Sequence, residues 1–407
     1  MQTRRNFIGN VATGLAGTFA TGRVPGANDR IRIGVIGVGD RGTQLAREAI
    51  ACPATEISAF ADIYTRRLED ALKLAPAARQ YPDYRRLLDD PSLDAVLIAT
   101  PQHLHAQPFI DAMDAGKHVY IEKTMAFTVE QAKLMRAAYR KAGTRESARV
   151  VQVGHQTCSL GHVADASNYL AGGAVGQVTA IRAHMYRNTP HGKPQWTRPV
   201  YPGMTPETIA WNSFLGSAPP RPFDPDRYLN WRLFHDYSGG NVHESMSQQL
   251  SFWYKVMDLD IPQAVTMTGG IYRWNDGREV PDTMSVAMVH ASIHNPGILF
   301  SWDSGFGNNH LGVTEDVLGT DGTISKGQQI RYFPQKVTRP DGVEMLGQTP
   351  TPPRAHMRNF LDCIRTGKPA KCPFEIGYRV SIACSMAIES YYAGRTVQWD
   401  PVKEELV

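Results

Sequence analysis

A glycine-rich turn between an apolar run and a helical pattern limits the folds open to this chain more than any other feature. The apolar run is Ile31–Ile36, and Gly37, Gly39 and Gly42 follow it in the spacing G-x-G-x-x-G. A helical pattern continues from Thr43. The first glycine allows a tight turn, the second lets the backbone approach a pyrophosphate, and the third permits close packing of helix on strand. This order of elements predicts a dinucleotide site with the phosphates at a helix N-terminus.

An acidic residue follows the turn at the spacing that such a site requires. The second predicted strand, residues 56–62, ends at Asp62, which lies 20 residues after Gly42. A carboxylate there binds the adenosine ribose hydroxyls and repels a 2′-phosphate, so NAD is favoured over NADP. Because Arg66 and Arg67 follow closely, the sequence does not exclude NADP.

Strands and helices then alternate up to residue 155, as in a doubly wound parallel sheet. The predicted elements are strand 93–100, helix 101–116, strand 118–123, helix 128–143 (capped by Thr128) and strand 148–155. Such sheets bind ligands at the carboxyl ends of their strands. The polar residues expected together at that edge are Thr100, His103, Lys123 and His155.

The second half of the chain alternates polar and apolar residues like strands with one buried face. Four segments show this pattern, residues 173–187, 263–274, 283–293 and 297–306. An aromatic and proline-rich stretch, residues 211–240, separates the first two, and its ring faces can stack on the C–H faces of a sugar. Arg232 and Asp236 in that stretch can bind hydroxyls. The alternative is that the stretch is a loop that packs in the core.

The charge of the chain excludes one broad class of partner. Its 407 residues carry 43 Lys and Arg against 39 Asp and Glu, a formal net charge of +4. Arg4, Arg5 and Arg23 lie in the first 27 residues, which contain no acid, so the remainder is close to neutral. A nucleic-acid-binding protein would carry a basic patch or run, and this sequence has no such run.

The first 27 residues have the pattern of an export signal. Their apolar part is short and diluted by Gly and Thr, which is too weak for a membrane span. TRRNFI, with Arg4 and Arg5, resembles the twin-arginine type, whose route exports folded proteins. A disordered basic tail is the alternative. We expect a signal peptide at 1–27, a dinucleotide-binding domain at 28–153 and a second domain at 154–407.

The cysteines predict neither a disulfide framework nor a metal site. There are five, an odd number, and they are scattered without a C-x-x-C pair. The spacing of zinc ligands is also missing.

Several short motifs make the chain resemble the glucose–fructose oxidoreductase, inositol dehydrogenase and rhizopine-catabolism (Gfo/Idh/MocA) family. They are GVIGVGDRG, ATPQHLH, VYIEKTMAFT, VQVGHQ, WNSFLG, the glycine pair at 239–240 and HMRNFLDCIRTG. The resemblance covers nearly the whole chain after the leader. It implies an α/β protein with an N-terminal Rossmann domain and a C-terminal domain built on a large, mostly antiparallel sheet. It also implies homo-oligomers that associate through that sheet.

The resemblance assigns a role to Lys123. The family's usual Glu-Lys-Pro stands here as Glu122, Lys123 and Thr124. The lysine of that motif contacts the reacting hydroxyl and helps with its proton. In the alternative, Lys123 is a surface lysine at the end of a strand.

The stretch SGGNVHESMSQQLSFWYK, residues 238–255, holds the remaining catalytic candidates. In the resembled family a helix here carries an acid and, four residues later, a histidine on the same face. The acid position is Glu244 and the histidine position is Gln248, which cannot take a proton. We rank Lys123 with Glu244 first, provided that apolar surroundings raise the pKa of Glu244, and His243 second because it lies off that face. In the alternative, His243 and Glu244 only cap the helix.

The predicted site therefore has a catalytic, a cofactor and a substrate part. The catalytic candidates are Lys123, Glu244 and His243. The cofactor-binding candidates are Gly37, Val38, Gly39, Asp40, Arg41, Gly42, Asp62, Thr100, Pro101, His103, His105, Glu122, Lys123 and Gln152. The substrate-binding candidates are His155, Gln156, Arg232, Asp236, Tyr237 and Gln248.

Three functions fit these features. The first is NAD-dependent hydride transfer from a hydroxyl of a sugar, polyol or glycoside. The second is an NAD-retaining glycosidase or lyase, which oxidises a sugar carbon, eliminates the aglycone and reduces the sugar again. Export favours the second because free NAD is scarce outside the cytoplasm, although the Tyr and His usual in the α-N-acetylgalactosaminidase subgroup are missing. The third is a non-catalytic, cofactor-bound sugar sensor. Gln248, which cannot take a proton, supports this function, and the retained motif lysine Lys123 speaks against it.

Overall fold

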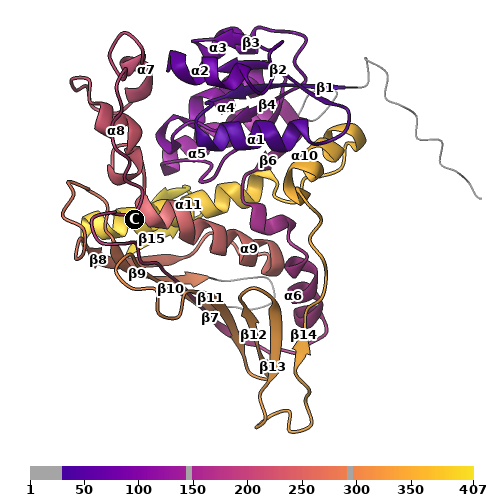
Figure 1. The fold of residues 1–407 in the computed structure, drawn as a ribbon. Coiled ribbons are helices and arrows are strands. Elements are labelled where there is room, and N and C mark those ends of the chain that lie inside the picture. The colour runs from indigo at the N-terminus through magenta and orange to yellow at the C-terminus, as the bar shows by residue number, and fades with distance from the viewer. Residues whose placement is uncertain (1–29, 144–148, 291–296) are drawn as a thin grey trace, which may run out of the picture. The chain divides into compact units, whose positions relative to one another are not determined.

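The strand that precedes the glycine turn lies in the middle of a parallel sheet of six strands (Figure 1). The computed structural model describes residues 30–143, 149–290 and 297–407, so the predicted signal at 1–27 lies outside the described residues. The strand order is β3-β2-β1-β4-β5-β6, with every pair parallel. The strands are β1 (Ile31–Ile36), β2 (Thr55–Ala61), β3 (Arg79–Tyr81), β4 (Ala95–Ile98), β5 (His118–Ile121) and β6 (Val151–Val153).

Helices cover both faces of this sheet, as the doubly wound pattern predicts. On one face α1 (Asp40–Ile50), α2 (Thr65–Leu72) and α10 (Ala355–Thr366) contribute to one buried apolar cluster. On the other, α3 (Tyr84–Leu88), α4 (Ala106–Asp114) and α5 (Val129–Gly143) contribute to a second. The predicted cap is present, since Thr128 Oγ1 accepts a hydrogen bond from the Gln131 N–H.

Two helix starts differ from the prediction. Helix α1 begins at Asp40 instead of Thr43, so Gly42 belongs to its first turn. The segment expected as one helix from 101 is a short 3₁₀ turn, Gln102–Leu104, followed by α4 from Ala106. Pro108 explains the second difference, because a proline without an N–H is tolerated in the first turn of a helix but not in its interior.

The second sheet has ten strands in the order β14-β13-β12-β11-β7-β10-β9-β8-β15-β16. Strands β7 and β10 pair in parallel, and the other pairs are antiparallel. The strands are β7 (Val178–Tyr186), β8 (Ala264–Gly270), β9 (Thr283–His290), β10 (Ile298–Gly305), β11 (Val313–Gly319), β12 (Gly322–Lys326), β13 (Ile330–Pro334), β14 (Met345–Leu346), β15 (Val397–Asp400) and β16 (Glu405–Leu406). The two sheets confirm the predicted fold class.

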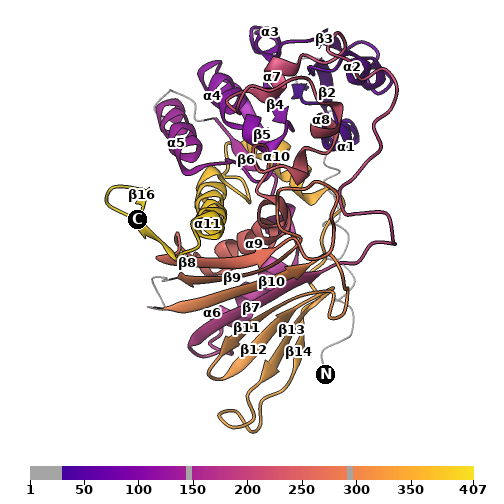
Figure 2. The same cartoon turned by 90° about the vertical axis from the view of Figure 1, so that its left-hand side faces the viewer.

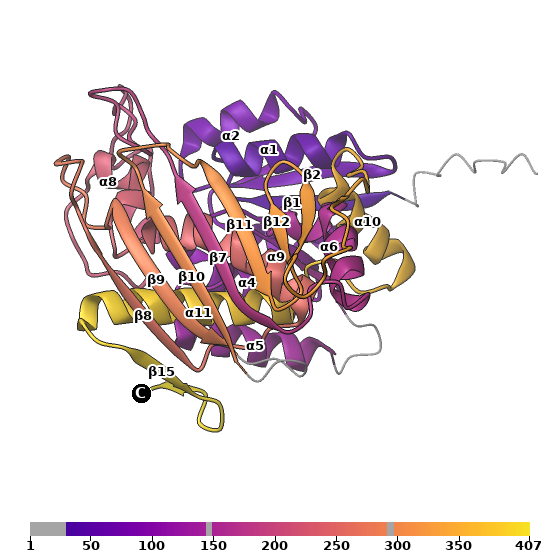
Figure 3. The same cartoon turned by 90° about the horizontal axis from the view of Figure 1, so that it is seen from below.

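Helices lie on one face of the large sheet. Figure 3 shows the strands toward the viewer, with α6 (His162–Ala171), α9 (Ser247–Met257) and α11 (Phe374–Ala393) behind them. Residues 31–407 form one compact unit. The first sheet ends at Val153, next to the predicted domain boundary at 153/154, which stays a prediction. Within the described ranges, no helix has both the length and the apolar character that crossing a membrane requires.

The segment between β7 and α9 leaves the large sheet and packs against the first one. It carries α7 (Trp211–Leu215) and α8 (Pro225–Leu229), which lie over the strands of the first sheet in Figure 2. The N–H of Ala210 donates to the carbonyl of Ile63 (3.0 Å), and the N–H of Thr65 donates to the carbonyl of Thr208 (3.1 Å). Aromatic side chains of this segment and Tyr64 form a separate buried cluster. We call residues 188–240 the cover segment.

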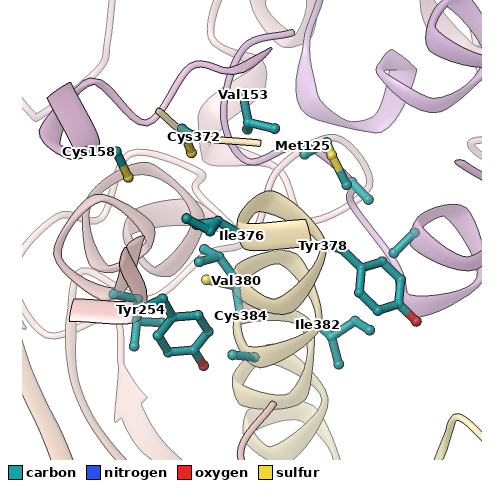
Figure 4. Close-up of a cluster of buried hydrophobic side chains, with 14 of the residues drawn as sticks. Met125, Val153, Cys158, Tyr254, Cys372, Ile376, Tyr378, Val380, Ile382 and Cys384 are labelled. Atoms are coloured by element: carbon teal, nitrogen blue, oxygen red, sulfur yellow. The ribbon is translucent and has the colours of Figure 1, made fainter. Parts of the chain in front are cut away.

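Helix α11 contacts both sheets, and Figure 4 shows its side chains Ile376 and Val380 in a buried apolar cluster with Val153 of β6 and Tyr254 of α9. Gly377 lies so close to β6 that an added Cβ would stand 2.6 Å from a methyl group of Val153. One turn later, Ser381 Oγ accepts a hydrogen bond from the Ala126 N–H. Near its end, Ser390 Oγ accepts one from the Met267 N–H of β8. The helix therefore fixes the carboxyl edge of the first sheet against the second.

The glycine turn generates the first prediction. A Cβ at residue 42 would stand 1.8 Å from the carbonyl oxygen of Gly37. Because this Cβ would collide with a backbone atom, Gly42→Ala should lower the free energy of unfolding by about 1–3 kcal/mol or more, as overpacking does. Thermal unfolding measures the loss. Gly143→Ala is the matched control, since nothing lies within 4 Å of a Cβ there. Equal melting temperatures for the two variants would show that the close approach at Gly42 does not limit stability.

Candidate active site

A cleft of about 1340 Å³ opens along the carboxyl edge of the first sheet. Its floor is the glycine turn, where Gly37 has φ +85° and a Cβ would stand 2.9 Å from Ala99. Its far wall comes from the cover segment and the start of α9. The volume exceeds that of an ordinary small-ligand pocket, roughly 300–1,000 Å³, so it has room for a dinucleotide and a substrate.

Asp62 lies in the cleft at the end of β2 and is 8% exposed. Its Oδ2 accepts from the Val38 N–H (2.8 Å) and its Oδ1 accepts from the Tyr64 N–H (2.9 Å). The carboxylate therefore fixes the glycine turn, and its contact with an adenosine ribose stays a prediction. Arg67 crosses above the turn, 3.5 Å from where a Cβ of Gly39 would be, while Arg66 stacks on Tyr201 outside the cleft.

A buried ion pair occupies the other end of the cleft. Lys123 Nζ lies 2.6 Å from Glu244 Oε2 and donates to the Glu244 carbonyl as well (3.1 Å). Both side chains are 12% exposed. Arg232 Nε (3.0 Å) and Gln102 Nε2 (2.9 Å) donate to Glu244 Oε1. Lys123 is thus a residue of the cleft and not a surface lysine.

The expected rise in the pKa of Glu244 is not found. Burial favours the neutral carboxyl, but the charges of Arg232 and Lys123 and their hydrogen bonds outweigh burial and lower the pKa to about 2. A carboxylate that weakly basic holds its cationic neighbours in position and accepts a proton poorly at neutral pH.

The local backbone explains why Glu244 and Gln248 face the cleft together. Residues Val242–Met246 form a single π-helical turn ahead of α9, a feature frequent at functional sites. Glu244 lies within that turn and Gln248 follows it, and both line the cleft. Gln248 Oε1 has no hydrogen-bond partner.

His243 does not reach the cleft. Its ring is fully buried, packs edge-on against Phe127 and has no partner at either nitrogen. Its carbonyl accepts from Thr124 Oγ1 (2.8 Å) and Ser247 Oγ (2.6 Å). Burial lowers the pKa of His243 to about 4, so the ring is neutral at pH 7 and sits behind Glu244.

Several predicted binding residues also lie outside the cleft. Gln152 is buried and donates to the carbonyl of His356, and His155 is buried with both ring nitrogens unpartnered. The ring nitrogens of His105 lie 2.8 and 2.9 Å from carbonyl oxygens of the chain. Asp236 pairs with arginines, and Tyr237 lies in the aromatic cluster. These residues support the walls.

Two positions of the glycine turn act through the backbone alone. Val38 is buried and gives its N–H to Asp62, and Gly42 allows α1 to approach Gly37. The predicted residues that do line the cleft are Gly37, Gly39, Asp40, Arg41, Asp62, Thr100, Pro101, His103, Glu122, Lys123, Gln156, Arg232, Glu244 and Gln248.

Sequence reasoning missed further residues of the cleft. They include Gln102, Trp196, Arg198 and Trp231. Gln102 comes directly after Thr100 and Pro101 in the turn that follows β4, so its place near a strand end was a usable signal. Arg198 forms an ion pair with Asp40 (2.6 Å), which is far from it in the sequence, and no local sequence pattern predicts this contact.

The residues present fit a dinucleotide. The tight glycine turn, the carboxylate at the end of β2 and the volume of the cleft all suit one, and the buried Thr100 Oγ1 has no partner within the protein. In the part of the chain that the structure describes, no group of three His, Cys, Asp or Glu side chains is placed to hold a metal ion.

Comparison with known proteins identifies the domain that holds the first sheet. Residues 31–154 match the model of the Gfo/Idh/MocA family, described as an oxidoreductase family with an NAD-binding Rossmann fold. This part of the chain is an NAD-binding Rossmann domain of that oxidoreductase family. The resemblance drawn from the sequence motifs is confirmed for these residues.

Curated relatives match more of the chain than the family model does. Levoglucosan dehydrogenase of Pseudarthrobacter phenanthrenivorans is 28% identical over 262 residues, 61% of this chain and 61% of that protein. Inositol 2-dehydrogenase of Salmonella paratyphi B is 26% identical over 301 residues, 68% of this chain and 81% of that protein. A solved structure of levoglucosan dehydrogenase with NADH and levoglucosan has a TM-score of 0.69 at 19% identity, covers 91% of this chain and 99% of its own, and shows the shared fold.

The cofactor end of the cleft generates the second prediction. NAD should bind more tightly than NADP, because the Asp62 carboxylate repels a 2′-phosphate. Asp62→Ala should weaken the binding of NAD and reduce the difference in affinity between NAD and NADP. Titration of the apo protein with each nucleotide measures both. Tighter NADP binding by the unmodified protein would overturn the assignment.

Proposed function

We propose that the protein is an NAD-dependent oxidoreductase that oxidises a hydroxyl of a sugar, polyol or glycoside. The observation that carries the proposal is the Lys123–Glu244 ion pair, which stands in a cleft shared with an NAD-binding Rossmann domain. The names of the relatives, levoglucosan and inositol dehydrogenases, support the substrate class.

Each polar residue of the cleft has its own role in the proposed reaction. Bound NAD supplies the hydride acceptor. Lys123 Nζ hydrogen-bonds the reacting hydroxyl and takes part in removing its proton. Glu244, with its lowered pKa, stays charged and positions Lys123, while Arg232 on the opposite side fixes Glu244. Gln248, whose Oε1 is free, orients the substrate.

A specific observation also favours the NAD-retaining glycosidase or lyase. The cover segment closes on the glycine turn through Arg198 and Asp40, and Arg67 donates to Tyr228 of the same segment (2.9 Å). An enclosed nucleotide exchanges slowly, which suits a cycle that ends with NAD regenerated. Native mass spectrometry of the purified protein separates the two: retained NAD and hydrolysis of a glycoside without net NADH favour the glycosidase, and NADH release favours the dehydrogenase.

The third prediction concerns turnover. Lys123→Ala and Glu244→Gln should each lower kcat by about 10²- to 10⁴-fold, the usual effect of losing a positioned proton-transfer group, while NAD still binds. Gln248→Ala should mainly raise KM for the sugar. If His243→Ala alone abolished turnover and Glu244→Gln did not, the buried ring would have to be the base, contrary to its position.

We also propose export and self-association. The twin-arginine pattern at residues 1–27 supports a periplasmic or other extracytoplasmic location. The face of the ten-stranded sheet without helices supports a homo-oligomer, and Val289 and Leu299, which pair across β9 and β10 on that face, are 41% and 38% exposed.

The export proposal gives the fourth prediction. Replacing Arg4 and Arg5 with lysines should stop translocation, because the twin-arginine route reads both arginines. Fractionation of cells that express each form measures it. Unchanged accumulation outside the cytoplasm would show that another signal acts.

A further inference from the structure

Two arginines lie beside the glycine turn, and each comes from a different segment of the chain. Arg67 belongs to α2, and its Cζ lies 3.5 Å from where a Cβ of Gly39 would be. Arg198 belongs to the cover segment, and its Nη2 lies 2.6 Å from Oδ2 of Asp40. Both arginines line the cleft next to the turn with which a Rossmann domain binds its dinucleotide.

Arg67 carries a charge that no carboxylate contacts. Within the described ranges it forms no ion pair, and its guanidinium makes one hydrogen bond, from Nη1 to the Tyr228 hydroxyl (2.9 Å). Burial lowers the pKa of Arg67, but Tyr228, Asp62 and other neighbours raise it on balance, so the group is charged. The oxygens of Asp62 accept backbone N–H groups instead of this guanidinium. A partly buried cation without an anion in contact is costly, so this one is placed for an anion that the protein itself lacks.

Asp40 increases the need for cations at this place. It is the first residue of α1, and its side chain is 73% exposed. A helix N-terminus favours an anion, but a carboxylate already standing there repels a negatively charged pyrophosphate. The hydrogen bond from Arg198 and the charges of Arg198 and Arg67 lower the pKa of Asp40. The two arginines therefore offset the repulsion that Asp40 would exert on a phosphate.

The backbone of Arg198 is fixed, although its side chain is 53% exposed. Asn230 Oδ1 accepts from the Arg198 N–H (2.8 Å), and Asn230 Nδ2 donates to the Arg198 carbonyl (3.0 Å). Asn230 is itself 3% exposed, and its Nδ2 also donates to Asp226 Oδ1 (2.8 Å). A buried amide thus holds the backbone of the arginine beside the glycine turn, while the exposed guanidinium is accessible to a ligand in the cleft.

We propose that Arg67 and Arg198 together bind the pyrophosphate of NAD, and we call this pair the arginine clamp. Guanidinium groups suit phosphates because their planar N–H groups match the phosphate oxygens. The clamp adds two side chains to the backbone N–H groups that the glycine turn supplies. Because it concerns only the binding of NAD, it does not rest on the proposed reaction.

The test compares ligands with and without a pyrophosphate on the full-length protein after bound nucleotide has been removed. ADP-ribose has the pyrophosphate, whereas adenosine has the same base and ribose without any phosphate. Calorimetry, with displacement titrations for the weaker ligand, measures both dissociation constants. Arg67→Met and Arg198→Met should each weaken the binding of ADP-ribose by about 10- to 100-fold and that of adenosine by less than about twofold, as expected from the loss of a hydrogen bond to a charged group.

Two control variants and a double variant make the test specific. Arg66→Met and Lys193→Met change cations of the same two segments that lie outside the cleft, and both should leave the two dissociation constants unchanged. Adding Asp40→Asn to Arg198→Met removes the repulsion by the carboxylate. If Arg198 contacts the phosphate, this addition restores only part of the affinity for ADP-ribose, and full recovery would overturn the contact.

The other outcomes decide each arginine separately from the proposed function. Equal weakening of ADP-ribose and adenosine by Arg67→Met would overturn the role of Arg67, and unchanged binding of ADP-ribose in both variants would overturn the clamp. If Arg67→Met does not fold, Arg198→Met, at an exposed side chain, still decides. None of these results bears on the proposed oxidation, which NADH formation from a sugar tests on its own.

Discussion

The rest of the site depends on the buried ion pair between Lys123 and Glu244. Removing two charges from water costs several kcal/mol per ion, and close pairing offsets that cost only if the remaining hydrogen-bonding groups are also satisfied. Here Arg232 and Gln102 donate hydrogen bonds to Oε1, the carboxylate oxygen of Glu244 that Lys123 does not bind. Each partner comes from a different part of the chain: the end of β5, the π-helical turn, the cover segment and the turn after β4. The fold must hold all four within hydrogen-bond distance.

Two features meet that demand. Helix α11 fixes the turn after β5 through Ser381 and the large sheet through Ser390, so the edges that carry Lys123 and Glu244 cannot drift apart. The π-helical turn then directs Glu244 into the cleft and His243 into the core. Since Gln248 stands at the position of the resembled family's histidine, the proposed reaction relies on Lys123, and Glu244 holds that lysine in place.

Local sequence patterns predicted the parallel sheet and the part of the cleft formed by the glycine turn and the strand ends. They could do so because apolar runs and glycine spacing directly reflect burial and backbone conformation. The motif resemblance placed Lys123 and Glu244. The same reasoning did not detect β3, whose three residues Arg79–Tyr81 carry no apolar pattern. It also set His155, Asp236 and Tyr237 in the cleft, because a place near a strand end or in an aromatic stretch does not say which way a side chain points. Arg198 depends on a contact across a long sequence separation, which one sequence does not display.

The cover segment links the two ends of the cleft. Its Arg198 pairs with Asp40 beside the glycine turn, and its Arg232 pairs with Glu244 beside Lys123. The first pair is 53% and 73% exposed, so by the usual worth of surface pairs it contributes no more than about 1 kcal/mol. The buried aromatic cluster around Phe214 and Tyr64 must therefore hold the segment down. Any opening wide enough for nucleotide exchange would disturb that cluster and draw Arg232 away from Glu244. A carboxylate that lost this cation would have a higher pKa and would hold Lys123 less firmly. In the proposed reaction, movement of this one segment would therefore couple cofactor exchange to proton transfer.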